Sequence, residues 1–464
     1  MHSNSPPTPG TSLRLPRAVL VLLLVVACLG PLLAAGPARP AHRTGGGDAA
    51  AVRALAQSAR PLTSTTPGAP GADLRPLDRM IGTARIVGLG EATHNSGEFF
   101  RMKHRVFKHL VEKKGFTTFA LEANWSAGLR LNDYVLHGRG DLDRIMREEF
   151  QNAYLMWNVR EYRELIEWMR AHNRTHDRKV QFMGNDLGYA GPVLFDTVER
   201  YVAAHYPRLA PEFEKLYRAS RPTAGVEETM SAYLRKPLPE RRAMGAQVER
   251  AYDLLARQRP GAGREEHAWV LQHARVIAQV GKEYTYDLFD DEEVADAMRH
   301  RDEAMARNTA WWQRHTGHRM LLSAHNGHVG LETSDPAHYP KLQGEFLREL
   351  VGDGAHGGYV SIGFTFGQGS FNANDLTDPK EPIRTFTVGP AAQGSNERTL
   401  ERVARGDYYL DLRTAPAAAR AWLGVARPTR SIGTAWPAEP EPVRLGATFD
   451  VLVHLHRITA ADRL

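Results

Sequence analysis

The sequence of 464 residues predicts an α/β fold with three layers, in which helices flank a mostly parallel sheet and a helical insertion forms a lid. Short apolar runs recur between residues 85 and 456, and segments with helical spacing separate them. This alternation is typical of parallel strands joined by crossover helices. A hydrophobic content of 42% and a charged content of 24% are ordinary for a protein that folds around a core.

The first segment has the pattern of an export signal. Arg14 and Arg17 precede an apolar run over residues 18–33, as in a secretory signal peptide, which we place at residues 1–38. The uninterrupted part of that run, residues 18–29, is shorter than the roughly 20 residues that a helix needs to span a bilayer. We therefore expect a secreted protein or one anchored to the outer face of the cell membrane.

Cys28 is the only cysteine of the chain, and it lies in the sequence Val25-Val26-Ala27-Cys28. This tetrapeptide resembles a bacterial lipobox, in which the cysteine is lipidated. The alternative is ordinary cleavage after a small-x-small site such as Gly36-Pro37-Ala38. In both cases the mature protein has no thiol for catalysis and no disulfide.

Residues 39–75 are rich in Gly, Pro, Ala, Ser and Thr, a composition typical of a flexible linker. We expect the catalytic domain to comprise residues 76–464. Its expected strands cover residues 85–90, 117–122, 180–186, 320–325, 359–366 and 449–456. Between the third and fourth of these strands, residues 191–316 have helical spacing and frequent prolines, which predicts the insertion.

Ionisable residues lie at or just after the ends of four of the expected strands. They are Glu91 and His94 just after the first strand, Glu122 at the end of the second, Asp186 at the end of the third, and His325 and His328 at and just after the end of the fourth. Because ligands of open parallel sheets bind beyond the carboxyl ends of the strands, we expect these side chains to share one rim. The sequence therefore predicts a catalytic or metal site there.

The helix expected over residues 98–113 has Phe100 and Phe107 on its apolar face, and Lys103 falls between them on the same face. The lysine either extends past the core to solvent or points into the site. Spacing alone favours the first orientation, in which the lysine extends past the core to solvent.

Composition and motifs exclude several classes of function. The net charge of +6 is small for this length, and no stripe of Lys and Arg indicates nucleic-acid binding. The sequence has no Gly-x-Ser-x-Gly, which disfavours a serine hydrolase of the α/β-hydrolase type. It also has no His-Glu-x-x-His motif, but His325 and His328 are spaced at i, i+3, so a site for a divalent metal ion stays an alternative. The metal-free alternative is a histidine that acts as general base on water.

Several segments resemble the erythromycin esterase family. The segment Gly88-Leu89-Gly90-Glu91-Ala92-Thr93-His94 is similar to the opening signature of that family. Further similar segments follow in order: Glu98-Phe99-Phe100, Lys103-His104-Arg105, residues 115–122, Gly184-Asn185-Asp186, residues 301–306, Ala324-His325-Asn326-Gly327-His328 and residues 359–363. The resemblance spans about residues 75–460.

The resemblance implies hydrolysis of a macrolide lactone ester by water, which inactivates the antibiotic and confers resistance. It also implies that His94 is the general base, that Glu91 and Glu122 orient it and the water, and that His325 and His328 form a downstream pair. Lys103 occupies a position that belongs to the site in this family.

We therefore hypothesise an exported hydrolase of a bulky, largely apolar carboxylic ester, with no cofactor. In this hypothesis His94 deprotonates water, and His325 with Lys103 stabilises the oxyanion. The partner is a small-molecule ester, and a membrane is contacted only through the signal peptide or a lipid on Cys28. Two alternatives remain: a haem- or metal-binding surface lipoprotein of related fold, and a metal-dependent hydrolase at the same rim.

Overall fold

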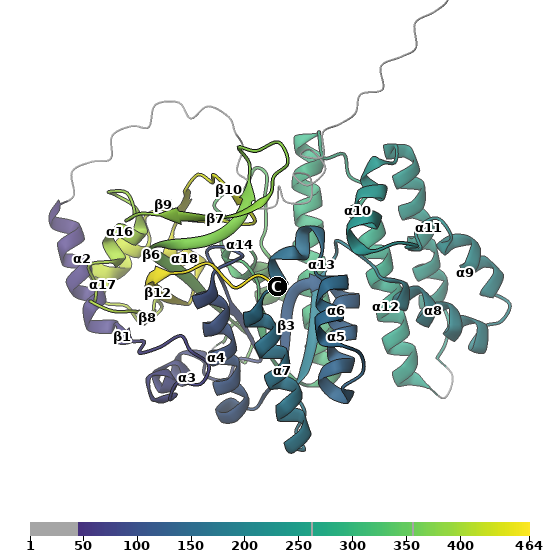
Figure 1. The fold of residues 1–464 in the computed structure, drawn as a ribbon, viewed down its shortest axis with the longest axis horizontal. Coiled ribbons are helices and arrows are strands. Elements are labelled where there is room, and N and C mark those ends of the chain that lie inside the picture. Colours follow the sequence, from purple (N-terminus) through teal and green to yellow (C-terminus); the bar gives the residue numbers. More distant parts are fainter. Residues whose placement is uncertain (1–44, 261–262, 355–356) are drawn as a thin grey trace, which may run out of the picture.

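A sheet of ten strands runs through the centre of the protein (Figure 1). The computed structural model describes residues 45–260, 263–354 and 357–464, and the expected signal peptide with Cys28 lies outside them. The strand order is β1 (Arg60–Pro61), β8 (Tyr408–Asp411), β12 (Val451–Ile458), β6 (Tyr359–Asp375), β2 (Ile86–Leu89), β5 (Arg319–Ser323), β3 (Phe116–Asn124) and β4 (Gln181–Asp186), while β7 (Ile383–Val388) and β10 (Ala435–Trp436) pair with β6.

The strands from β12 to β4 pair in parallel, and they include all six strands expected from the sequence, which are thereby confirmed. The sequence analysis missed the antiparallel additions β1, β7 and β8. On one side of β2 lie β5 and then β3, and on the other side lies β6. The chain therefore continues from β2 to β3 on one side, and it later adds β6 on the opposite side. Such a reversal of strand order opens a crevice at the carboxyl ends of the strands.

Side chains that alternate along each strand enter two hydrophobic cores, one on each face of the sheet. In β2, Val87 and Leu89 pack in the core under helices α4 (Gly97–Lys114) and α7 (Arg160–Thr175), whereas Ile86 packs in the other core. The second core includes residues of α13 (Asp291–Thr316) and α15 (Gln343–Val351). The three layers predicted from the sequence are confirmed.

The first core is completed by further helices on the same face of the sheet. These are α3 (Arg75–Ile81), α5 (Trp125–His137), α6 (Leu142–Glu149) and the short 3-10 helix η3 (Asn152–Trp157). Helix α5 begins where the Asn124 side chain accepts a hydrogen bond from the Ala127 amide at 2.7 Å. This cap follows β3 directly, so the strand ends at a defined residue beside the rim.

The helical insertion is present between β4 and β5 and lies beside the sheet in Figure 1. Its helices are α8 (Pro192–His205), α9 (Ala210–Tyr217), α10 (Val226–Arg235), α11 (Leu238–Ala256), α12 (Arg264–Glu283) and α13. Helix α13 begins where the Asp290 side chain accepts from two backbone amides, and it ends at Gly317, whose φ of 70° is left-handed. This long helix carries residues from the insertion to the rim of the sheet.

The segment expected to be a flexible linker is different in the structure. Residues 45–58 form helix α2 (Gly45–Ser58), which packs with α17 (Ala417–Leu423) and buries Leu55. Further along the chain, Asp73 lies in the short 3-10 helix η2 (Ala72–Leu74) and forms an ion pair with Arg105 of α4 at 2.6 Å. The prediction of a flexible linker over residues 39–75 was therefore wrong for residues 45–75, because this segment packs on the domain.

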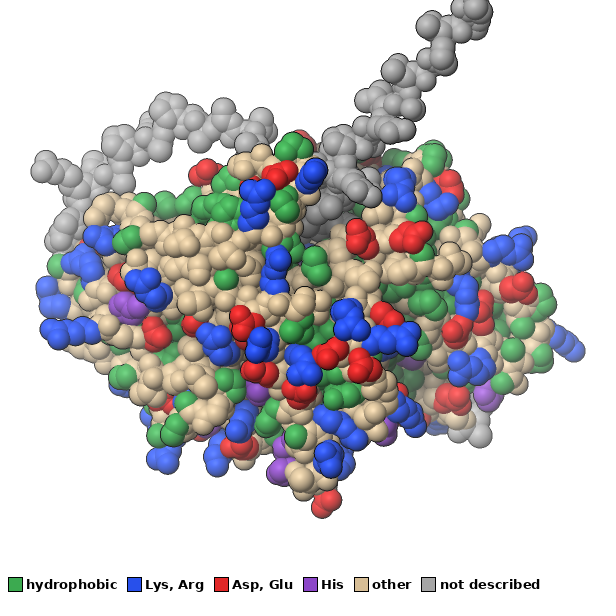
Figure 2. Space-filling view, viewed as in Figure 1, with side chains coloured by type: hydrophobic (Ala, Val, Ile, Leu, Met, Phe, Trp, Pro, Cys, Tyr) green, Lys and Arg blue, Asp and Glu red, His purple; other side chains and the backbone are tan. Residues whose placement is uncertain are grey.

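Shorter elements complete the chain. They are α14 (Asn326–Val329), α16 (Asn396–Leu400), α18 (Leu445–Thr448), β9 (Arg427–Thr429) and β11 (Glu441–Val443). Within the described ranges, no helix has both the length and the apolar character that a membrane crossing requires. On the face shown in Figure 2, acidic and basic side chains are interspersed.

Candidate active site

The loop after β2 brings Glu91 and His94 into contact. His94 Nδ1 lies 2.8 Å from Glu91 Oε1, and both side chains are buried. Gly90 follows the strand directly, and a side chain there would collide with Asn326, whose Oδ1 would lie 2.2 Å from its Cβ. The Gly90 amide also donates to Ile362 O at 2.8 Å, which fixes the start of the loop against β6.

Backbone contacts from distant parts of the chain hold the rest of this loop. The Ile432 amide donates to Ala92 O at 2.8 Å, and the His94 amide donates to Gly433 O at 3.4 Å. At the end of the loop, where α4 begins, the Gly97 amide donates to Thr459 O at 2.9 Å. The position of His94 thus depends on segments that follow β9 and β12.

Lys103 is completely buried, and its ammonium group donates to Glu91 Oε2 and, at 3.2 Å, to Ala324 O. Burial lowers the pKa of Lys103, and the charge of Glu91 opposes that effect. Of the two orientations, spacing alone favoured extension to solvent, but the lysine points toward the site. Its contacts with Glu91 and Ala324 fit a supporting residue, while its predicted share in stabilising an oxyanion stays a prediction.

His325 faces His94 across the rim. It follows β5, and its ring centroid lies 4.9 Å from that of His94. Trp157 contacts His94 edge-to-face with ring centroids 5.0 Å apart, and its indole N–H donates to Glu122 O at 2.8 Å. Residues from β2, β5, β3 and η3 therefore meet at one point.

The two facing imidazoles are held in opposite tautomers. The Glu91 carboxylate can only accept, so His94 Nδ1 donates to it, and in the neutral ring Nε2 is then the nitrogen that carries the lone pair. In His325, Nδ1 accepts from the Gly327 amide at 3.2 Å, so Nε2 carries the proton. Burial, and after it the His94 ring, lowers the pKa of His325 well below its usual range, which keeps the ring neutral. Within the described residues, the buried Nε2 of His325 has no hydrogen-bond partner.

Glu122 organises a second group of charged residues at the rim. Its Oε2 accepts from the His325 amide at 2.9 Å, and its Oε1 lies 3.1 Å from His328 Nε2. Burial alone would raise the pKa of Glu122, but the surrounding histidines and Arg301 hold it well below its usual range. Glu122 thus positions His325 and His328, and its predicted role in orienting His94 and the water stays a prediction.

His328 is a supporting residue whose two ring nitrogens are both engaged. Nδ1 lies 2.9 Å from Asp302 Oδ1, opposite the contact with Glu122. Although burial favours the neutral ring, the carboxylates of Asp302 and Glu122 raise the pKa of His328 to about 10. The imidazolium is therefore the form present at neutral pH.

Arg301, which the sequence analysis did not select, links the insertion to the sheet. Its Nε and Nη2 donate to the two oxygens of Asp186 at 2.8 and 2.7 Å, and Nη2 also donates to Glu122 at 3.2 Å. Burial disfavours the charged guanidinium, but Asp186 and Glu122 raise the pKa of Arg301 well above its usual value. Arg301 and Asp302 lie in one of the segments that resemble the family, and that segment was the signal available for finding them.

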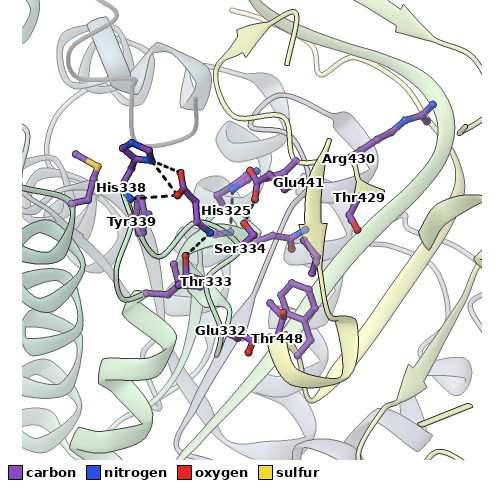
Figure 3. A pocket seen from close by; sticks show the side chains of 18 of the residues that line it. His325, Glu332, Thr333, Ser334, His338, Tyr339, Thr429, Arg430, Glu441 and Thr448 are labelled. Atoms are coloured by element: carbon purple, nitrogen blue, oxygen red, sulfur yellow. Dashed lines mark hydrogen bonds and ion pairs between the residues drawn. The ribbon is translucent and has the colours of Figure 1, made fainter. Parts of the chain in front are cut away.

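A cavity of about 280 Å³ adjoins His325 (Figure 3). His338 and Tyr339 lie on one side of it and Thr429 and Arg430 on the other, while Ser334 and Glu441 lie between them and are joined by a hydrogen bond. Its apolar lining comes from the insertion and from the last part of the chain: Leu288, Val294, Met298, Val443 and Phe449. The insertion therefore supplies part of the cavity wall next to the paired histidines.

The rim offers few free ligand atoms for a metal ion. Within the described residues, the ring nitrogens that remain available to an ion are Nε2 of His94 and Nε2 of His325. Nδ1 of both rings and both nitrogens of His328 already contact other groups. Zn²⁺ sites use at least three protein ligands. In the described part of the chain, the group of His, Cys, Asp and Glu side chains with metal-compatible spacing lies elsewhere.

Comparison with protein families identifies relatives of this chain. The erythromycin esterase family matches residues 111–458. Erythromycin esterase type II of Escherichia coli is 35% identical over 115 residues, and type I of the same organism is 31% identical over 111 residues. These segments cover 25% and 24% of this chain, and the chain spans about a quarter (26%) of the length of each relative.

Solved structures are similar over more of the chain. A succinoglycan biosynthesis protein is 30% identical with a TM-score of 0.77, and a Bacillus cereus protein is 27% identical with a TM-score of 0.79. Each similarity covers 90% of this chain and 99% of the other. An erythromycin esterase variant in its open conformation, at 18% identity and a TM-score of 0.66 over 88% of this chain and 98% of that one, shares the fold.

The family match covers about three quarters of the chain, and the fold is shared with a solved erythromycin esterase variant. This chain belongs to the erythromycin esterase family, a family of hydrolases.

Proposed function

We propose that this protein hydrolyses a carboxylic ester in a bulky, largely apolar substrate, such as a macrolide lactone, with water activated by His94. The observation that supports this proposal is the complementary pair of imidazoles. His94 presents a lone pair on Nε2, while His325 presents an N–H on its own Nε2, and the two rings lie 4.9 Å apart.

In this scheme His94 Nε2 takes a proton from water as the water oxygen attacks the ester carbonyl carbon. The imidazolium that forms is stabilised by Glu91, which already accepts from Nδ1. When the tetrahedral intermediate collapses, the carbon–oxygen bond to the alcohol breaks. His94 then returns its proton to the leaving oxygen, and the site is restored.

The role of His325 follows from its unpartnered N–H. The negative charge that develops on the carbonyl oxygen requires a donor that is already oriented. The Gly327 amide donates to Nδ1 of His325, and the backbone amide of His325 donates to the Glu122 carboxylate. Because these two hydrogen bonds hold the ring, its Nε2–H needs no rearrangement to donate. A neutral donor also favours the imidazolium form of His94, because the ring that faces it carries no positive charge.

The cavity supports a substrate with a large apolar part. Its lining includes Leu288, Met298 and Phe449, and polar groups such as Arg430 and Ser334 are interspersed among them. Apolar walls with a few polar groups are typical of small-molecule sites. The names of the Escherichia coli relatives point to erythromycin, which we propose as the first substrate to test.

The test is mass spectrometry of macrolides and simple esters incubated with the purified protein, where hydrolysis adds one water to the product. We expect His94→Ala to lower kcat/KM by about 10²–10⁴-fold and His325→Ala by about 10²–10³-fold. The exposed His176→Ala should retain wild-type turnover.

Near-normal hydrolysis by a folded His94→Ala variant would remove His94 from the base role. Treatment with a chelator, at a temperature where the protein stays folded, should leave the rate unchanged, since the scheme uses only side chains of the chain. Loss of activity that returns on addition of a divalent ion would favour the metal-dependent alternative instead.

We also propose that the protein acts outside the cytoplasm, with the substrate as its partner and no nucleic acid. The support is the basic and apolar pattern of residues 14–33. Fractionation of cells, with mass spectrometry of the mature first residue, tests this proposal and distinguishes a lipidated Cys28 from cleavage near Ala38. Full-length protein in the cytoplasmic fraction would contradict it.

A further inference from the structure

A second group of metal-ligating side chains lies outside the rim. It consists of Glu401, which follows α16, and of His454 and His456, which project from the same face of β12. One potential ligand atom from each of the three lies within 4.8 Å of the others. We refer to these residues as the β12 cluster.

The spacing within the β12 cluster is close to that of a coordination site. Glu401 Oε1 lies 3.0 Å from His454 Nε2, and Glu401 Oε2 lies 3.2 Å from His456 Nδ1. Two ligands that are each about 2.0–2.1 Å from a tetrahedral ion are separated by roughly 3.3 Å. Small side-chain rotations therefore suffice to bring the three ligand atoms around one ion.

His454 is oriented as a metal ligand usually is. Its Nδ1 lies 2.9 Å from Thr365 Oγ1, which fixes the ring while Nε2 faces Glu401. Histidines that bind metals commonly engage their other nitrogen in this way. The His454 side chain is fully buried, whereas those of His456 and Glu401 are 23% and 24% exposed, so an ion can enter from solvent.

The backbone around the β12 cluster leaves room for the carboxylate. A Cβ at Gly367 of β6 would lie 1.9 Å from Glu401 Oε1, so only glycine permits this approach. The His456 amide donates to Asp407 at 2.8 Å, which places a second carboxylate beside the cluster. Within the described residues, the buried Nε2 of His456 has no hydrogen-bond partner.

We propose that Glu401, His454 and His456 form a binding site for a divalent transition-metal ion of the Zn²⁺ type. Two imidazoles and one carboxylate suit Zn²⁺, Ni²⁺ or Cu²⁺, whereas Ca²⁺ and Mg²⁺ require sites composed of oxygen ligands. Water completes the coordination on the exposed side.

The ion would connect the end of α16 to β12, next to the wall of the substrate cavity. Thr365, which orients His454, also lines that cavity. Arg430 lines it as well, and its guanidinium donates to Gly367 O at 2.5 Å. The site is thus separate from the paired histidines but shares neighbours with the cavity, and binding to the folded state alone would stabilise the fold.

The experiment starts from protein that a chelator has stripped of metal. Calorimetric titration with Zn²⁺ measures binding, and titration with Co²⁺ reports nitrogen and oxygen ligands through the visible absorption of the bound ion. We expect one ion per chain and a higher Tm in the presence of Zn²⁺. His456→Ala should weaken binding at least about tenfold and abolish the shift in Tm. His315→Gln is the matched control, because His315 pairs with a single carboxylate, Glu265, at 2.8 Å.

Zn²⁺ binding that is the same in wild type, His456→Ala and Glu401→Gln would place the ion elsewhere and overturn the proposal. The absence of any Zn²⁺ or Co²⁺ binding to the stripped wild type would also overturn it. If His456→Ala does not fold, His456→Gln, which keeps a hydrogen bond to Glu401, replaces it. Ester hydrolysis is measured in parallel, so a failure of the proposed activity is distinguished from a failure of metal binding.

Discussion

Glu91 is held between an imidazole and an ammonium group, and all three side chains are buried. The Lys103 ammonium compensates the charge that Glu91 would otherwise carry alone in the interior. Glu91 thus accepts from His94 Nδ1 and from the Lys103 ammonium group at the same time. The orientation of the His94 ring therefore depends in part on Lys103.

Replacing Lys103 with Met leaves the carboxylate of Glu91 buried without its cation. We expect the free energy of unfolding to fall by about 3–5 kcal/mol, as for other buried pairs that lose one partner. Urea unfolding followed by circular dichroism measures this change. The double variant Lys103→Met/Glu91→Gln should recover part of the loss, and purely additive effects of the two substitutions would contradict the pairing.

At the level of single residues, the sequence predicted that Glu91, His94, Glu122 and His325 share one rim, since each lies at or just after the end of a parallel strand. It did not predict which carboxylate contacts which histidine. Glu122 lies next to His328 and not His94 because the end of β3 is separated from β2 by β5. Pairing of side chains depends on strand order, and spacing along the chain does not contain that information.

Among the elements, α13 connects the insertion to the catalytic rim. Arg301 lies near the middle of this helix and binds Asp186 of β4 through two hydrogen bonds. The neighbouring Asp302 binds His328 at 2.9 Å. One helical turn thus neutralises Asp186 and orients the second histidine of the rim.

Replacement of Arg301 with Gln should destabilise the protein by about 3–5 kcal/mol, because Asp186 and Glu122 lose their shared cation. The matched control is Arg307→Gln on the same helix. Arg307 is 57% exposed and pairs with Glu303 at i−4, so its loss should cost only about 0.3–0.5 kcal/mol. Equal changes in urea midpoint for the two variants would contradict a special role for Arg301.

The strands and the insertion were predictable because their apolar patterns differ, with short buried runs in the one and helical spacing in the other. The ordered structure of residues 45–75 was not predictable in this way. Its small residues suit a linker, but Leu55 and Leu74 give it enough apolar surface to pack on the domain. Composition describes the average of a segment, whereas a few buried leucines decide whether it is ordered.

For the whole molecule, the pKa of His328 makes stability depend on pH. The folded state holds the proton up to a pH of about 10, whereas the ordinary value is 6.5. The folded state therefore binds more protons than the unfolded state between these values, and stability falls as pH rises through this range. Below pH 6.5 the contribution is fully present.

We expect the urea midpoint of the wild type to decrease between pH 6.5 and about 10 more steeply than that of His328→Gln. The variant cannot take up the proton, so it lacks this part of the slope. Chemical denaturation at several pH values measures both slopes. Parallel curves would show that His328 titrates normally in the folded protein.

The order of the strands and the antiparallel edge of the sheet could not be predicted from sequence patterns. Strand β8 has four residues, and β1 has two, so neither shows a clear alternation. The placement of β5 between β2 and β3 depends on contacts between residues that are more than two hundred positions apart in the chain. Only the complete packing of both faces selects this arrangement.

The backbone contacts of the loop that carries His94 bear on the timing of biosynthesis. Glu91 and His94 are made early, yet the amides and carbonyls that fix their loop belong to residues 432, 433 and 459. A nascent chain that ends after β6 already contains every rim residue but cannot hold this loop in place. Catalytic competence should therefore arise only after the ribosome has released nearly the whole polypeptide.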